Sequence, residues 1–285
     1  MDFSSFTFIK SIKSTNSSIC FNPPTTLTHL DSKYFYEISS LKELRLQRKY
    51  IQHLSLPNNL TALTIIDFIQ ISHYSQLIQL SLYSNKSFPF MLYRMLTYLS
   101  FSCNTCGSLY LLTQLKVLYL NKIIKSVDVE SFYPISLEFL QCYSNSLPMK
   151  LLITQLVLND SLNQHNIQYY SHLCSLKTLG LISYSTLLPS SLTSLSVSCF
   201  GLSQNHISFS EINCINVKQL HIENCNTHNV ELPSCLDSLY LHYSEFEITN
   251  PSIFYTLILN ESKINGEMIQ KEFYKEFLLQ KIKRK

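Results

Sequence analysis

Glycine and charged residues are scarce in this chain, and long apolar runs are missing. Only four of the 285 residues are glycine, which excludes a glycine-rich phosphate-binding loop. Charged residues make up 14%, against roughly 25% in typical domains, and the net charge of +3 gives too weak a positive field for nucleic-acid binding. No apolar run is long enough for a transmembrane helix, and residues 1–13 lack the continuous apolar stretch of a signal peptide. We therefore expect no nucleic-acid partner, no membrane span and a cytoplasmic location.

Cysteine usage points to the same compartment. The nine cysteines are an odd number and lie scattered along the chain, unlike the dense paired framework of a small secreted domain. A reducing environment fits this pattern better. The pair Cys103 and Cys106 suggests zinc or redox chemistry, but no second pair or histidine stands at ligand spacing. We therefore expect neither a metal nor a cofactor.

Leucine recurs in one phrase, L-x-x-L-x-L, which appears thirteen times between Leu27 and Leu259. The clearest copies are Leu41-Leu44-Leu46, Leu77-Leu80-Leu82, Leu115-Leu118-Leu120, Leu176-Leu179-Leu181, Leu192-Leu195-Val197 and Leu236-Leu239-Leu241. Looser copies begin at Leu27, Leu60, Leu96, Leu137, Ile153, Val217 and Phe254. The third position is apolar in every copy except the one with Ser32, if Cys142 counts as apolar. A mean spacing of about 19 residues predicts a stacked repeat architecture.

Each phrase also has the alternation of a half-buried β-strand, as in Leu118-Tyr119-Leu120-Asn121. A strand this short cannot bury its apolar face alone, so we expect successive copies to stack in parallel around a leucine core. Proline stands three residues before the first apolar position at Pro24, Pro57, Pro134, Pro189, Pro233 and Pro251. Because proline breaks helices, the segments between strands are expected to be short and mostly extended.

The phrase followed three residues later by Asn or Cys is similar to the consensus of leucine-rich repeats. That final position holds Asn85, Asn104, Asn145 and Cys225, with Ser161, Ser244 and Ser262 as substitutes. The version L-P-x-S-L-T-x-L also resembles the short FNIP-type repeats of slime-mould and amoebal proteins. This resemblance implies the α/β repeat class: a right-handed solenoid with a parallel β-sheet of about 13 short strands and little helix on its convex side. It also implies that the Asn side chain bonds buried backbone groups along the turn.

Three segments follow from this reading. We predict an N-terminal cap over residues 1–23, a solenoid over 24–262, and a C-terminal capping helix with a basic tail over 263–285. The helix prediction rests on an apolar stripe at helical spacing, formed by Ile269, Phe273, Phe277, Leu278 and Ile282. Its terminal cations, including Lys283 and Arg284, leave a membrane- or nucleus-targeting tail as the alternative.

In the leucine-rich-repeat family the strand residues between the apolar ones point to the concave face, which is the usual binding surface. Five aromatic residues would gather there as a protein-binding site: Tyr83, Tyr98, Tyr119, Phe139 and Tyr143. Clustered aromatics with little charge resemble an interaction hot spot. The alternative is that tyrosine, with 18 copies, simply favours half-buried strands. A second group, His221, Glu223, Tyr240, His242 and Tyr243, is expected to be a polar rim, and Glu43, Arg45 and Arg48 a solvated face.

These features predict a non-enzymatic scaffold that binds a protein or peptide on its concave face. No arrangement of a nucleophile with a base is identifiable from spacing, so we assign no catalytic residues. Two alternatives remain open. One is a substrate-recognition or regulatory subunit of an enzyme complex, like a ubiquitin-ligase adaptor, and the other is a surface adhesin. The sequence does not identify the partner or the oligomeric state.

Overall fold

The chain forms stacked short parallel strands joined by turns and extended segments. The computed structural model describes residues 8–13, 24, 26–32, 40–46, 57–66, 76–83, 93–102, 109–122, 132–148, 150–162, 167–180, 187–198, 216–230, 232–248 and 255–264. The chain divides into two compact units, Met1–Leu140 and Gln141–Lys285, and each is taken by itself below. The only helix among the described residues is one 3-10 turn at Ser144–Ser146.

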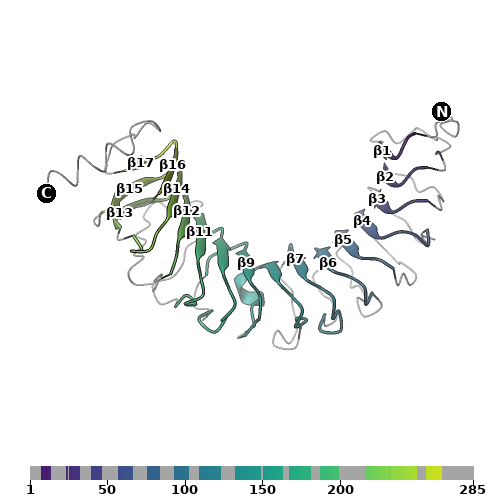
Figure 1. Ribbon diagram of the computed structural model, residues 1–285, viewed down its shortest axis with the longest axis horizontal. Coiled ribbons are helices and arrows are strands. Elements are labelled where there is room, and N and C mark those ends of the chain that lie inside the picture. The colour runs from purple at the N-terminus through teal and green to yellow at the C-terminus, as the bar shows by residue number, and fades with distance from the viewer. Residues whose placement is uncertain are drawn as a thin grey trace. The chain divides into compact units, whose positions relative to one another are not determined.

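The first unit is a parallel sheet in which strand order follows chain order (Figure 1). Its strands are β1 (Ser11–Lys13), β2 (His29–Ser32), β3 (Glu43–Leu46), β4 (Ala62–Ile66), β5 (Gln79–Tyr83), β6 (Tyr98–Phe101), β7 (Val117–Leu120) and the first half of β8 (Phe139–Cys142). The middle leucines of successive phrases are cross-strand partners, as in Leu44, Leu63 and Leu80. Each of these is at most 2% exposed. The predicted parallel stacking of leucine phrases is therefore confirmed in this unit.

In the repeats that carry it, proline has a defined place in the turn before the strand, a turn that other repeats close with a residue such as Tyr93 or Leu112. The first leucine of the phrase donates its N–H to the proline carbonyl three residues earlier, as Leu60 does to Pro57 at 3.1 Å and Leu192 to Pro189 at 3.1 Å. Proline fits the first position of this tight turn, because the turn uses its carbonyl as an acceptor and requires no N–H from it. The N–H groups of the next two residues both donate to one carbonyl of the preceding repeat, as those of Thr97 and Tyr98, which follow Leu96, do to Ile78 O.

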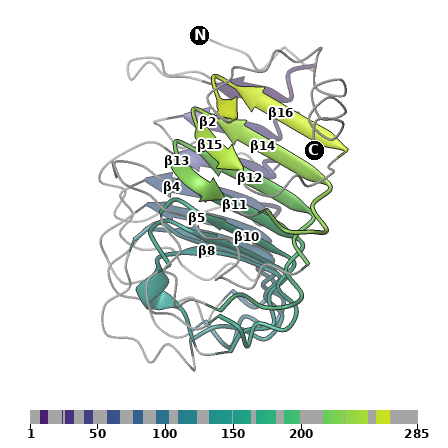
Figure 2. The ribbon, with the colours of Figure 1, turned by 90° about the vertical axis from the view of Figure 1, so that its left-hand side faces the viewer.

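The second unit contains two parallel sheets. The larger continues in chain order through β9 (Gln155–Leu158), β10 (Ser175–Thr178), β11 (Ser194–Ser198), β12 (Gln219–Glu223), β14 (Ser238–His242) and β16 (Thr256–Asn260). The smaller comprises β13 (Asn226–Val230), β15 (Glu245–Ile248) and β17 (Lys263–Ile264). Figure 2 shows β13 and β15 running as a second layer beside β12 and β14. The sequence did not predict this second sheet.

One repeat of the second unit lies in a different register from the predicted one. Leu176, expected at the first position of its phrase, is the cross-strand partner of Leu156 and Leu195 and is therefore the middle leucine. The phrase reads Leu173-Leu176-Thr178, so a threonine takes the buried third position. Its hydroxyl donates to the carbonyl of Asp160 at 2.8 Å, which removes the cost of burying a polar group. A glycine follows because a β-carbon at Gly180 would lie 2.7 Å from the backbone nitrogen of Ser161.

The corners that connect the two sheets share one backbone conformation, a residue with positive φ. Asn224, Tyr243 and Glu261 all have positive φ, at 54°, 48° and 49°, and each is followed by a small buried residue. These small residues, Cys225, Ser244 and Ser262, form a ladder of hydrogen bonds. The Cys225 N–H donates to Ser244 Oγ at 3.1 Å, and the Ser244 N–H donates to Ser262 Oγ at 3.0 Å. Serine hydroxyls therefore satisfy the backbone here, in the role that the resemblance gave to asparagine.

At Asn145 that implied role is wrong. The Asn145 side chain is exposed, whereas the preceding residue, Ser144, is buried. Ser144 donates both its N–H and its hydroxyl to the Asp160 carboxylate, at 2.8 and 3.0 Å. The carboxylate of the next repeat thus satisfies this turn in place of an amide.

Both terminal segments contain a strand. β1 lies within residues 1–23 and pairs in parallel with β2, so the sheet reaches into the segment predicted as a cap. β17 opens the segment 263–285 and pairs with β15. The predicted C-terminal helix, with its stripe from Ile269 to Ile282, lies outside the described residues. No described helix is both long and apolar enough to cross a membrane.

Candidate protein-interaction surface

The first unit presents one face of its sheet on which the side chains between the buried leucines lie; we call it the open face. Parallel register aligns these side chains in lines across the strands. Gln79, Tyr98 and Val117 are neighbours in one line, and Ser81, Ser100 and Tyr119 in the next. Phe139 continues the first line, because its N–H donates to Lys116 O just as that of Val117 donates to Thr97 O.

Tyr98, Tyr119 and Phe139 form a continuous aromatic row on this open face. The ring centroids of Tyr98 and Tyr119 are 5.5 Å apart, and those of Tyr119 and Phe139 are 5.0 Å apart. The rings tilt by 44° and 39°, an arrangement within the range favoured by aromatic pairs. All three side chains are half-buried, so the row offers apolar area that is already held in place.

Tyr83 stands beside the row at the end of β5 and is 42% exposed. The pKa of Tyr98 is raised, mainly by burial and further by its proximity to Tyr119 and Tyr83, although hydrogen bonds with Ser81 and Ser100 oppose the shift. Tyr98 therefore keeps its proton at neutral pH. Lys116 and Glu138, which precede β7 and β8, pair with each other at 2.9 Å.

The fifth predicted residue, Tyr143, belongs to the second unit. It follows β8 directly, is half-buried, and accepts a hydrogen bond from the Ser146 N–H at the 3-10 turn. The structure therefore brings together four of the five predicted aromatics within one unit. Tyr143 remains a prediction.

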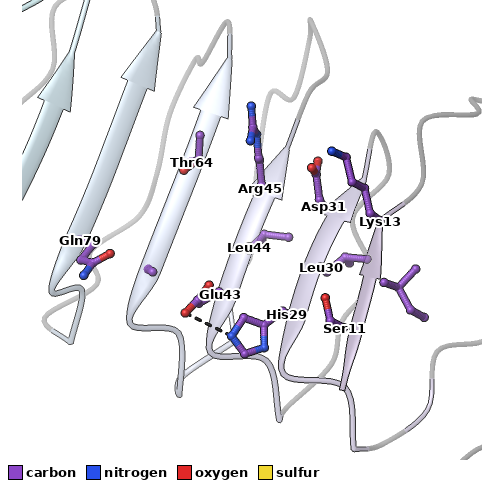
Figure 3. A pocket seen from close by; sticks show the side chains of 12 residues that line it. Ser11, Lys13, His29, Leu30, Asp31, Glu43, Leu44, Arg45, Thr64 and Gln79 are labelled. Atoms are coloured by element: carbon purple, nitrogen blue, oxygen red, sulfur yellow. Dashed lines mark ion pairs between the residues drawn. The ribbon is translucent and has the colours of Figure 1, made fainter. Parts of the chain in front are cut away.

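Sequence reasoning missed a shallow groove of about 360 Å³ across β1 to β5, which we call the charged groove. Figure 3 shows Asp31 between Lys13 and Arg45 in one line, and below them His29 beside Glu43. His29 Nε2 lies 3.2 Å from Glu43 Oε1. Lys13 lines the groove but lies outside every leucine phrase, so the repeat pattern gave no indication of this groove. Glu43 and Arg45 of the expected solvated face line this groove, and Arg48 lies outside the described residues.

In the second unit, the side chains between the buried leucines of β12 and β14 include the predicted group around Glu223, with His221, Tyr240 and His242. The Glu223 carboxylate accepts a hydrogen bond from Ser198 Oγ at 3.0 Å and lies 3.2 Å from His242 Nδ1. The ring centroids of His242 and Tyr243 are 4.2 Å apart, and the ring planes are tilted by 35°. Burial acts to raise the pKa of Glu223, but hydrogen bonds from Ser198 and His242 and the nearby histidines lower it overall. Burial lowers the pKa of His221.

Among the described residues Ser198 donates to the Glu223 carboxylate and to no histidine, so this part of the chain does not present a serine–histidine pair here. Among the described residues no cluster of three or more His, Cys, Asp or Glu side chains could hold a metal ion. The Cys103 and Cys106 pair lies outside the described residues.

Parallel strands in register, a leucine core and an open face of alternating side chains define a leucine-rich-repeat-like solenoid. The structure is similar to the crystal structure of CroV588, which is described as a novel circular LRR protein, with a TM-score of 0.54 and 18% sequence identity. The match covers 85% of this chain and 41% of that chain, so this chain spans less than half of CroV588. No family model and no curated protein matches the sequence. The likeness at this identity concerns the fold alone.

Proposed function

We propose that the protein is a non-enzymatic scaffold that binds a protein or peptide on the open face of its first unit, centred on the aromatic row. The observation that carries this proposal is the contact of three rings from three successive strands. Half-buried rings held by a sheet lose little conformational entropy on binding, and such anchors dominate interface energies. Tyr83 extends the surface, and we include Tyr143 as a further contact of the second unit.

The leucine-rich-repeat fold supports a binding role in general, since this architecture commonly serves as an interaction scaffold. We infer a cytoplasmic location. The nine cysteines, an odd number scattered along the chain, support a reducing compartment.

The test compares Tyr119→Asp with Tyr110→Asp in quantitative affinity capture from a lysate of the source cells. Tyr110 is the matched control because it lies in the same unit, is 55% exposed, and stands in a turn before β7 and outside the strands that carry the row. A charge in the middle of the row should reduce the capture of at least one partner by about tenfold or more. Both variants must retain the wild-type circular dichroism spectrum. Equal recovery of every partner by both variants would refute the proposal.

A further inference from the structure

We propose that the protein binds a second copy of itself head to tail, with the outer edge of β1 in one copy pairing in parallel with the outer edge of β16 in the other. This inference goes beyond the proposed function, because it concerns the two outermost strands and not the aromatic row. Three observations carry it: the hydrogen-bonding groups at the two edges, the exposure of the core at β16, and the charges beside β1.

Both edges lack a strand partner among the described residues. β1 is the outermost strand of the first unit, and Figure 3 shows Ser11 and Lys13 on it. β16 is the outermost strand of the larger sheet in the second unit. An unpaired strand edge presents backbone N–H and C=O groups to which another strand can be added.

The two edges offer opposite halves of a hydrogen bond that recurs along the sheet. The N–H groups of Tyr255 and Thr256 both donate to Asp237 O of the preceding repeat, at 2.9 and 3.1 Å. The Tyr255 carbonyl would be the acceptor for a following strand, and no residue in the described ranges donates to it. On β1 the equivalent donors are the N–H groups of Lys10 and Ser11, which have no acceptor in the described part of the chain. The donors of β1 therefore complement the acceptor of β16.

The leucine core is incompletely covered at β16. Leu239 and Leu241 of β14 are at most 1% exposed, because a strand lies on each side of them. Their cross-strand partners in β16, Leu257 and Leu259, are only half-buried. Ile12 and Leu257 are each the partner of a middle leucine, so continuing the register places Ile12 of the second copy beside Leu257. Pairing of the two edges then removes apolar surface from water.

The charges beside β1 favour β16 as its partner over a second β1. Lys10 and Lys13 are exposed at this edge. Contact between two β1 edges would bring the lysines of both copies together, and like charges on adjacent strands destabilise a sheet. Pairing with β16 instead places Lys13 beside Ile258 and Lys10 beside Tyr255, which is 85% exposed. Tyr255 offers the lysine stem an apolar surface and its ammonium group an aromatic ring.

Sedimentation equilibrium of the full chain between about 1 and 200 µM, the range of weak complexes, tests the proposal. We expect the mean mass of the wild type to rise with concentration above that of one chain. Ser11→Pro removes an outward N–H and places a ring at the edge, so it should weaken association about tenfold or more. Ser11→Ala is the matched control, because it keeps the N–H and should associate as the wild type does.

A second pair of variants tests the register without altering the backbone. Ile258→Lys places a cation beside Lys13 of the second copy, whereas Ile258→Glu places an anion there. We therefore expect Ile258→Lys to associate about threefold or more weakly than Ile258→Glu. Amide hydrogen exchange locates the contact, because Lys10 and Ser11 should exchange more slowly at about 200 µM than at about 1 µM.

A wild type that keeps the mass of one chain at every concentration overturns the proposal, and the two edges would then be covered within one chain or by another protein. Association that Ser11→Pro leaves unchanged also overturns it, as does equal association of Ile258→Lys and Ile258→Glu. In either case the contact would lie elsewhere. Circular dichroism spectra that match the wild type guard against unfolding, and the Ile258 pair still decides if Ser11→Pro fails to fold. The capture experiment at the aromatic row is independent of these outcomes.

Discussion

Replacing Ser244 by Ala removes the middle rung of the ladder between the two sheets of the second unit. The Ser244 hydroxyl accepts from the Cys225 N–H at 3.1 Å and donates to the His242 carbonyl at 2.8 Å. Ser244 is 3% exposed and Cys225 is fully buried, so water does not reach the freed groups. The change leaves the Ser244 N–H bonded to Ser262 Oγ, which confines the damage to one rung.

The size of the effect follows from the two lost hydrogen bonds. A buried N–H without a partner costs about 1–3 kcal/mol, and an ordinary hydrogen bond contributes about 0.5–1.5 kcal/mol. We therefore expect Ser244→Ala to lower the free energy of unfolding by about 2–4 kcal/mol. Ser244→Cys should fall between Ser and Ala, because Cys225 already occupies the equivalent corner and its thiol donates to Glu223 O at 3.3 Å. Ser238→Ala, at the start of β14, the strand that precedes this corner, is the control and should change stability by less than about 0.5 kcal/mol.

Urea unfolding followed by far-ultraviolet circular dichroism measures these differences, provided that the slope of the transition is the same for all variants. Amide hydrogen exchange adds local resolution, because the Cys225 amide should exchange faster in Ser244→Ala. A loss below about 0.5 kcal/mol for Ser244→Ala, or unchanged exchange at Cys225, would refute the ladder as a stabilising device.

Two further predictions concern the register of one repeat and the response to pH. Leu176→Ala should lower the free energy of unfolding by about 2–5 kcal/mol because Leu176 is fully buried. Leu179→Ala should lower it clearly less because Leu179 is only partly buried. If urea unfolding showed the larger loss for Leu179→Ala, the register Leu176-Leu179-Leu181 would be correct instead. Glu223 has a lowered pKa in the folded protein, so its contribution is present above its unfolded pKa and is lost as pH falls through the folded value. Stability measured from pH 6 down to the acid limit should therefore decline less steeply in Glu223→Gln than in wild type, and parallel curves would contradict this linkage.

The sequence predicted those parts of the fold that depend on neighbouring strands alone. Period-two alternation places Tyr98 and Tyr119 on the open face, and parallel register then makes them neighbours, so their contact needed no knowledge of the loops. The same reasoning placed Phe139 in the row. Burial of the middle leucines, such as Leu99 and Leu118, followed for the same reason.

The parts that the sequence did not predict depend on the segments between strands. Leu176, Leu179 and Leu181 satisfy the phrase as well as the correct register does, and a hydrogen bond from Thr178 to Asp160 O compensates for the polar residue in the core. The second sheet needs backbone corners with positive φ at residues such as Tyr243, a conformation that is uncommon outside glycine and that no apolar pattern signals. The charged groove needs Lys13 from β1, whose strand Ser11–Lys13 lacks a leucine phrase.

In-register stacking also makes the open face easy to alter by evolution or by design. Each repeat contributes one strand to the open face, adjacent strands are about 4.8 Å apart, and the side chains of each strand contact only those of the strands beside it. Duplicating a repeat would therefore insert one more strand of side chains without changing the contacts of more distant strands. A substitution such as one at Ser81 or Thr64 would alter a single position of the open face, so the recognised ligand could be lengthened or respecified one residue at a time.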